Sequence, residues 1–228
     1  MKWADVKESD IVLEAGMGTG RIVNKMVPAA STVVGLDFSS TKLTRFRKGC
    51  VGVHYVVADV SHLPFREKSF TLVICLGVTC YLPPNATGIT NMRSSVLALE
   101  EFRRVLKKPG RLIVDFHNAL NPLGLWHHMF NYAVLKTPQF YGVLRNSIET
   151  VLMQRFRLAD SVSWDYTPIP SEIIRRLLPN FFVHWYLPFW RNLGRFLCSR
   201  SRLIASLMPY DFAYKLKALN SNTGTQAN

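Results

Sequence analysis

Residues 11–20 read Ile11-Val-Leu-Glu-Ala-Gly-Met-Gly-Thr-Gly20, and this stretch decides the fold. Its apolar start predicts a short buried strand, and the glycines allow a sharp turn into a helix that we expect to reach about Val27. Glycines at such a turn also let a ligand approach the main chain closely. The spacing is acidic-x-Gly-x-Gly-x-Gly, because Arg21 stands where the dinucleotide fingerprint GxGxxG has its third glycine. Glu14 would repel a pyrophosphate but would attract the ammonium group of an amino acid.

Short apolar runs alternate with helical patterns through the rest of the first half of the chain. The pattern predicts strands at 32–37, 53–57, 70–76 and 111–116, and helices at 40–48 and 94–107. Lys107-Lys-Pro-Gly110 ends the last of these helices with cations and a Pro-Gly break. This alternation is typical of crossover units, so we predict an α/β fold with a doubly wound, mostly parallel sheet and helices on both faces.

Three carboxylates follow three successive predicted strands. Glu14, Asp37 and Asp59 would gather at one edge of a parallel sheet, which is where such folds bind ligands. Asp37 is suited to accept hydrogen bonds from both ribose hydroxyls, or else it caps the helix that begins near Ser40. Asp59 could accept from an adenine amino group or act as a turn residue. Together the three predict a nucleoside site.

The run from Ile11 to Asn118 resembles the class I S-adenosylmethionine-dependent methyltransferases, of the broad small-molecule type called methyltransferase-11-like. The matching pieces occur in the expected order, and they are 12–20, 34–39, 58–65, 69–74 and 99–114. The resemblance implies a Rossmann-like, seven-stranded sheet whose seventh strand is antiparallel. Residues 180–187 (Asn-Phe-Phe-Val-His-Trp-Tyr-Leu) are the candidate for one of its last two strands.

The same resemblance implies the residues that hold S-adenosylmethionine. The glycine turn would contact its methionine part. The end of the second strand would contact the ribose, and the end of the third strand would contact the adenine. Leu76 and Gly77 would line the floor beneath the sulfonium. The full set is Glu14, Gly16, Gly18, Gly20, Asp37, Phe38, Asp59, Val60, Leu76 and Gly77.

Methyl transfer is an in-line displacement, so the protein mainly positions the acceptor and excludes water. An oxygen acceptor gains from a general base. His117, after the fifth strand, and Tyr81, after the fourth, are the catalytic candidates, and each could instead be structural or solvent-exposed. His127 and His128 are further candidates in a segment rich in aromatic residues. We find no spacing typical of a metal site or a covalent nucleophile.

The chain is expected to divide into four parts. Residues 1–118 form the cofactor-binding core, and 119–168 form an inserted helical lid over the acceptor. Residues 169–190 supply a helix and a strand that complete the sheet, and 191–228 are a basic amphipathic segment with a frayed tail. Only about ten residues precede the first strand, so we expect the lid to come from the insertion unless the native start is missing. Its aromatic residues suit a hydrophobic acceptor, or they pack a helical cap onto the sheet.

The formal charge of +13 favours an anionic neighbour, although a generally basic proteome would also account for it. Residues 191–217 alternate basic and apolar side chains beside Trp185 and Trp190. This pattern indicates peripheral contact with an anionic membrane surface or a helical pair with a solvated basic face. Nucleic acid is a weaker expectation, because no known RNA-binding module is present.

The sequence therefore predicts methyl transfer to an oxygen or nitrogen of a hydrophobic, lipid-linked or sugar-like small molecule. RNA methylation and a catalytically silent binding module stay open, while Arg21 counts against a nicotinamide-dependent oxidoreductase. No apolar run reaches the roughly 18 residues of a membrane span, and the start does not resemble a signal peptide. The cysteines Cys75 and Cys80 are expected to be buried free thiols. We predict a cytoplasmic protein, peripheral at the membrane if the basic segment binds there.

Overall fold

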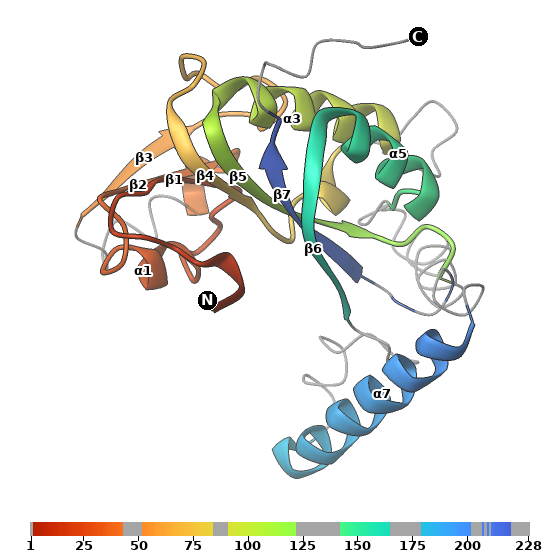
Figure 1. Ribbon diagram of the computed structural model, residues 1–228. Coiled ribbons are helices and arrows are strands. Elements are labelled where there is room, and N and C mark those ends of the chain that lie inside the picture. Colours follow the sequence, from red (N-terminus) through yellow and green to blue (C-terminus); the bar gives the residue numbers. More distant parts are fainter. Residues whose placement is uncertain are drawn as a thin grey trace, which may run out of the picture.

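The computed structural model describes residues 2–42, 52–83, 91–121, 142–164, 179–201, 207, 209 and 211–219. Seven strands form one sheet in the order β3-β2-β1-β4-β5-β7-β6 (Figure 1). The strands are β1 (Ile11–Ala15), β2 (Thr32–Asp37), β3 (Val53–Val57), β4 (Phe70–Cys75), β5 (Leu106–His117), β6 (Phe156–Trp164) and β7 (Asp211–Ala218). The helices are α1 (Val23–Met26), α3 (Met92–Val105), α5 (Arg145–Arg155) and α7 (Asn180–Arg200), with short 3₁₀ turns η1 (Lys2–Ala4) and η2 (Thr79–Tyr81).

The first five strands are parallel, and β1 lies at their centre. It pairs with β2 on one side and with β4 on the other, so that Glu14 sits opposite Gly35 and Ile74. The order of strands reverses between β1 and β4, and the carboxyl ends on both sides of this switch point meet at one edge. β7 runs antiparallel to both β5 and β6. The predicted Rossmann-like, doubly wound fold is confirmed.

Two apolar layers cover the sheet, one on each face. α3 and α5 pack on one face through residues such as Phe102 and Leu152, which are buried with every second residue of β5 and β7. α1 packs on the opposite face through Val23 and Met26, against Val12 and Ile74. Figure 1 shows these helices on opposite sides of the strands. Because both faces are buried, the strands are nearly continuous apolar runs, as expected for a parallel sheet.

The strand predicted over residues 180–187 is wrong. These residues begin α7, a helix that extends to Arg200. Phe182, Trp185 and Phe189 recur at intervals of three and four, which is the period of a helix, but the first eight residues alone are too rich in aromatic side chains to show it.

The last two strands lie elsewhere. β6 falls within the segment predicted as a helical lid, and β7 falls within the segment predicted as a basic amphipathic tail. In β7 the side chains of Phe212, Tyr214 and Leu216 are buried while the residues between them point to the other face, which is the two-residue period of a strand. The alternation of Lys and apolar residues in β7 is therefore the pattern of a strand, and the predicted amphipathic tail is wrong for these residues.

Other expectations are met only in part. α1 is a single short turn, Val23–Met26, that ends next to the predicted end at Val27, and the helix predicted from Ser40 is described only as far as Lys42. About half of the predicted lid, including His127 and His128, lies outside the described residues. Cys75 and Cys80 are buried and free, as predicted.

We predict that the core depends on α3. Phe102→Ala is expected to lower the free energy of unfolding by about 3–5 kcal/mol, because it leaves a cavity beneath a fully buried ring. Leu97→Ala on the exposed side of the same helix should change it by about 0.5 kcal/mol or less. Denaturant unfolding of both variants checks this, and equal effects would contradict the assignment of the buried face.

Candidate cofactor site

The turn after β1 requires its glycines. Gly16, Gly18 and Gly20 all have positive φ angles, of 85°, 56° and 79°. A Cβ on Gly16 would also lie 2.1 Å from Cγ2 of Val78, whereas a Cβ on Gly18 would meet nothing within 4 Å. Side chains are therefore excluded at Gly16 by contact with the protein, and at Gly18 by backbone conformation alone. The open space at Gly18 leaves its main chain accessible to a ligand.

Hydrogen bonds from β2 hold this turn in place. The amides of Gly16 and Met17 both donate to the carbonyl of Leu36, at 2.7 and 2.9 Å. Asp37 accepts from the amide of Gly18 through Oδ2 at 2.8 Å and from the amide of Ser39 through Oδ1 at 2.9 Å. Each carboxylate oxygen still has capacity for another hydrogen bond. Asp37 thus holds two loops in place and can at the same time accept hydrogen bonds from hydroxyl groups.

Glu14 has a buried carboxyl group with one oxygen atom unpartnered within the described part of the chain. Its side chain is 3% exposed, and Oε2 has no hydrogen-bond partner among the described residues. Burial raises the pKa of Glu14 to about 8, and the charge of Asp37 adds to this effect while Arg21 opposes it. A carboxylate without a partner at this depth is costly, and a bound ammonium group would relieve the cost.

The loop after β3 is fixed to α3. Asp59 is exposed and its Oδ1 accepts from the amide of Ser61, while Val60 beside it is buried. Further along, the amide of Leu63 donates to Glu101 at 2.7 Å, and Arg104 donates to the carbonyl of Leu63 at 2.9 Å. Asp59 thus acts as a turn residue here, and its exposed carboxylate keeps capacity for a further donor. Phe38, after β2, is 79% exposed.

The end of β4 is bound to the end of β5. The amide of Gly77 donates to both carboxylate oxygens of Asp115 at 2.9 Å, and the hydroxyl of Thr79 donates to the carbonyl of Asp115 at 2.7 Å. Gly77 has a φ of 68°, and a Cβ there would meet nothing within 4 Å. Leu76 beside it is half-buried. Burial raises the pKa of Asp115 to about 7, and the charge of Asp211 contributes.

His117 forms a pair with an acid that sequence reasoning missed. Nδ1 of His117, at the end of β5, contacts Oδ1 of Asp211, the first residue of β7. Burial would lower the pKa of His117, but the hydrogen bond and charge of Asp211, with a smaller contribution from Cys80, outweigh it and raise the pKa well above its usual value. Asp211 carries no signal of its own in the sequence, because only the antiparallel pairing of β5 with β7 brings the two together.

Tyr81 lies in η2, immediately beyond β4, and is 63% exposed. The hydroxyl of Thr79 ties η2 to β5, so Tyr81 and His117 come from neighbouring strand ends. Among the described residues, no group of three His, Cys, Asp or Glu could hold a metal ion.

The switch point of this sheet has a glycine turn braced by Asp37 and two glycines with open space beside them. This arrangement is typical of Rossmann-like folds. Comparison with known proteins identifies the family within this fold class. The methyltransferase-domain family matches residues 13–114. An uncharacterized protein of Methanocaldococcus jannaschii is 31% identical over 205 residues, which cover 90% of this chain and 80% of that protein. The chain therefore belongs to the class I S-adenosylmethionine-dependent methyltransferases.

Relatives with a named activity match this chain over a smaller share of their length. The ubiquinone/menaquinone biosynthesis C-methyltransferase UbiE of Haemophilus ducreyi is 28% identical, over 64% of this chain and 56% of that protein. The demethylmenaquinone methyltransferase of Chlamydia muridarum is 32% identical, over 59% of this chain and 58% of that protein. This chain thus spans somewhat more than half the length of each.

Solved structures share the fold across most of the chain. The N-methyltransferase NodS of Bradyrhizobium japonicum, solved with S-adenosyl-L-homocysteine, is 11% identical with a TM-score of 0.57, over 93% of this chain and 80% of that one. An S-adenosylmethionine-dependent methyltransferase of Mesorhizobium loti is 14% identical with a TM-score of 0.58, over 92% and 91%. At these identities the likeness concerns the fold alone.

The raised pKa of Glu14 predicts how stability depends on pH. Between pH 4.5 and about 8 the folded protein keeps a proton on Glu14 that the unfolded chain has lost, so the free energy of unfolding should fall as pH rises. Glu14→Gln removes this contribution and is expected to stabilise the ligand-free protein by about 1–3 kcal/mol at pH 8. Denaturant unfolding at pH 5 and pH 8 measures it.

Glu8→Gln is the matched control, because Glu8 is exposed and outside the site. Its pH dependence of stability should equal that of the unaltered protein. If the free energy of unfolding of Glu14→Gln falls with pH as steeply as that of the unaltered protein, Glu14 is not the group that holds the extra proton.

Proposed function

We propose that this chain binds S-adenosylmethionine at the carboxyl edge of its sheet and methylates an oxygen or nitrogen of a hydrophobic, lipid-linked small molecule. The observation that carries the cofactor assignment is Oε2 of Glu14, a buried carboxylate oxygen with no partner among the described residues beside an open glycine turn. The names of the quinone-methylating relatives support a small, hydrophobic ring as the acceptor.

The residues of this edge fit the parts of the cofactor. Glu14 would hold the ammonium of the methionine part, with Gly16, Gly18 and Gly20 allowing close approach to the main chain. Asp37 would accept from the ribose hydroxyls, and Asp59 with Val60 and Phe38 would hold the adenine. Leu76 and Gly77 would lie beneath the sulfonium. When bound, the cofactor supplies a methyl group already activated by the sulfonium charge.

His117 is the proposed general base. The ring would take the proton of the acceptor hydroxyl or amine as the new bond to the methyl group forms. Asp211 is a positioning residue: it fixes the ring through Nδ1 and stabilises the protonated form. Tyr81, at the neighbouring strand end, is the second candidate to contact the acceptor.

Calorimetric titration with S-adenosylhomocysteine tests the cofactor assignment. The unaltered protein is expected to bind it, to give no signal with NADH, and to lose at least about tenfold in affinity on Asp37→Ala, because two ribose hydrogen bonds are removed. Binding that Asp37→Ala leaves unchanged would place the nucleoside elsewhere. Absence of binding would favour a catalytically silent module.

The His117–Asp211 pair predicts the pH profile of methyl transfer. Activity should rise with pH through the raised pKa of His117, since only the neutral ring accepts a proton. Asp211→Asn removes the charge that raises this pKa, so the acidic limb of the profile should move to lower pH while kcat falls. His117→Gln should lower kcat by about 100-fold or more.

The assay can use a hydroquinone with a short side chain and an amine of similar size as acceptors, with the methylated atom determined by NMR. His54→Gln is the control, because His54 is exposed on β3. If Asp211 positions the base, Asp211→Asn should move the acidic limb of the pH profile. If Asp211 has only a structural role, the variant should lower activity equally at every pH. An unmoved limb would remove His117 from catalysis.

A further inference from the structure

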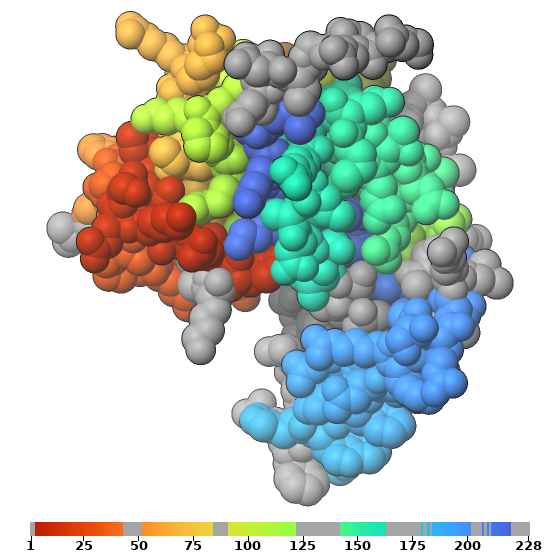
Figure 2. Space-filling model, viewed as in Figure 1, coloured from red at the N-terminus to blue at the C-terminus, as the bar shows by residue number. Residues whose placement is uncertain are grey.

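Helix α7 stands beyond the carboxyl edge of the sheet. Figures 1 and 2 show it projecting from the body of the protein, below the ends of β6 and β7. The chain that follows it is tied to the loop after β5, because Asn118 donates to the carbonyl of Pro209 at 3.0 Å and Asn121 to that of Leu207 at 3.4 Å. The base of α7 therefore lies on the same side as the His117–Asp211 pair.

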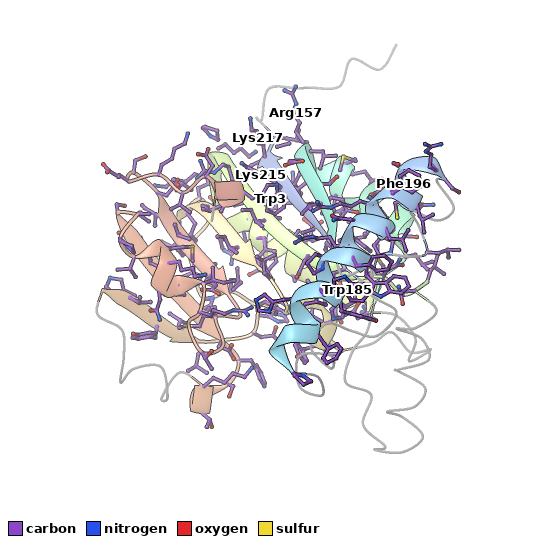
Figure 3. All side chains as sticks on the ribbon, turned by 90° about the horizontal axis from the view of Figure 1, so that it is seen from below. Trp3, Arg157, Trp185, Phe196, Lys215 and Lys217 are labelled. Atoms are coloured by element: carbon purple, nitrogen blue, oxygen red, sulfur yellow. The ribbon has the colours of Figure 1, made fainter. Side chains whose placement is uncertain are left out.

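One face of α7 carries a row of exposed aromatic rings. Trp185, Phe189 and Phe196 are 67%, 46% and 56% exposed, and their spacing places them on one side of a helix. The rings of Trp185 and Phe189 stack with centroids 5.5 Å apart. The side that includes Gly194 and Leu197 is more buried. Figure 3 shows Trp185 and Phe196 along this helix. The row is thus an apolar surface on the outward side.

Cations border the aromatic row. Arg191, Arg195 and Arg200 are exposed, and the guanidinium of Arg200 lies 5.0 Å from the centre of the Phe196 ring. Residues 180–200 contain no Asp or Glu, and the whole chain carries a formal charge of +13. None of the described helices has the length and apolar character needed to cross a membrane.

We propose that α7 lies in the plane of an anionic lipid bilayer, with the aromatic row (Trp185, Phe189 and Phe196) in the boundary between headgroups and acyl chains and the three arginines at lipid phosphates. Tryptophan and phenylalanine with arginine at their border are the composition of interfacial helices. Arginine contributes a charge attraction to anionic headgroups that salt weakens.

A lipid surface fits this face better than nucleic acid does. Single-stranded nucleic acid is held by aromatic rings on which bases stack, so each ring needs a face open to a base. Trp185 and Phe189 stack on each other, and the guanidinium of Arg200 lies over Phe196, so each ring already has one face occupied within α7 and at most one face left for a base. A bilayer needs only an apolar row with cations beside it. Bound in this way, α7 would hold the carboxyl edge of the sheet close to the lipid.

Vesicle sedimentation of the full chain tests the proposal, without cofactor or acceptor, so that its outcome is independent of the proposed methyl transfer. We expect binding to vesicles of phosphatidylcholine with phosphatidylglycerol, little binding to phosphatidylcholine alone, and weakening by salt. Trp185→Ala with Phe189→Ala should lower affinity by at least about tenfold. Arg191→Glu with Arg195→Glu should do the same.

A matched control separates the helix from overall charge. Arg157→Glu with Lys217→Glu makes the same change in net charge on paired, exposed residues of β6 and β7, away from α7 (Figure 3). It should alter vesicle affinity by about twofold or less, given the short range of screened charges. Circular dichroism checks that each variant is folded.

Three results would overturn the proposal. In one, the control variant weakens vesicle binding as much as the arginine variant on α7. In another, the aromatic variant binds vesicles like the unaltered protein. In the third, vesicles do not bind, while the α7 variants abolish binding to an RNA oligonucleotide or dissociate a dimer in sedimentation velocity, which would identify the row as a different interface.

Discussion

The parallel pairing of β1 with β2 on one side and β4 on the other is the constraint on which the structure depends. Val12 packs in the layer on one face of the sheet and Leu13 and Ala15 in the layer on the other, so a shift in register by one residue would exchange the side chains that β1 presents to the two layers. This register sets Glu14 beside Gly35 and brings the ends of β1, β2 and β4 to one edge. The glycine turn, its brace from Asp37 and the open space at Gly77 all follow from that alignment.

The site accumulates carboxylates in places where folding alone would not favour them. Glu14 and Asp115 are both buried with raised pKa values, and Asp37 lies near enough to Glu14 to raise its pKa further. Their surroundings differ: Oε2 of Glu14 has no hydrogen-bond partner among the described residues, Asp115 accepts from the amide of Gly77, and Asp37 accepts from two loop amides. Buried carboxyl groups that lower the stability of the fold are typical of sites that give up some stability for ligand binding.

The second half of the molecule builds the acceptor side from elements that are distant in sequence. β7 returns antiparallel between β5 and β6 and is held to α5 by Tyr214, which donates to Glu149 at 2.7 Å. Its first residue, Asp211, then meets His117, and the segment before it connects to α7. The proposed base and the proposed membrane helix therefore both depend on where β7 docks.

The sequence by itself determined the cofactor half, because its signals are local. Glu14 and the glycines lie within one turn, Asp37 and Asp59 end their own strands, and the apolar runs are short and separated, so the parallel sheet and its binding edge could be predicted. The tertiary structure alone decided the rest. β7 could not be distinguished from an amphipathic tail, nor residues 180–187 from a strand, until packing showed which period was buried. The pairing of His117 with Asp211 spans 94 residues and arises only from strand register, a long-range consequence of core burial that no local pattern encodes.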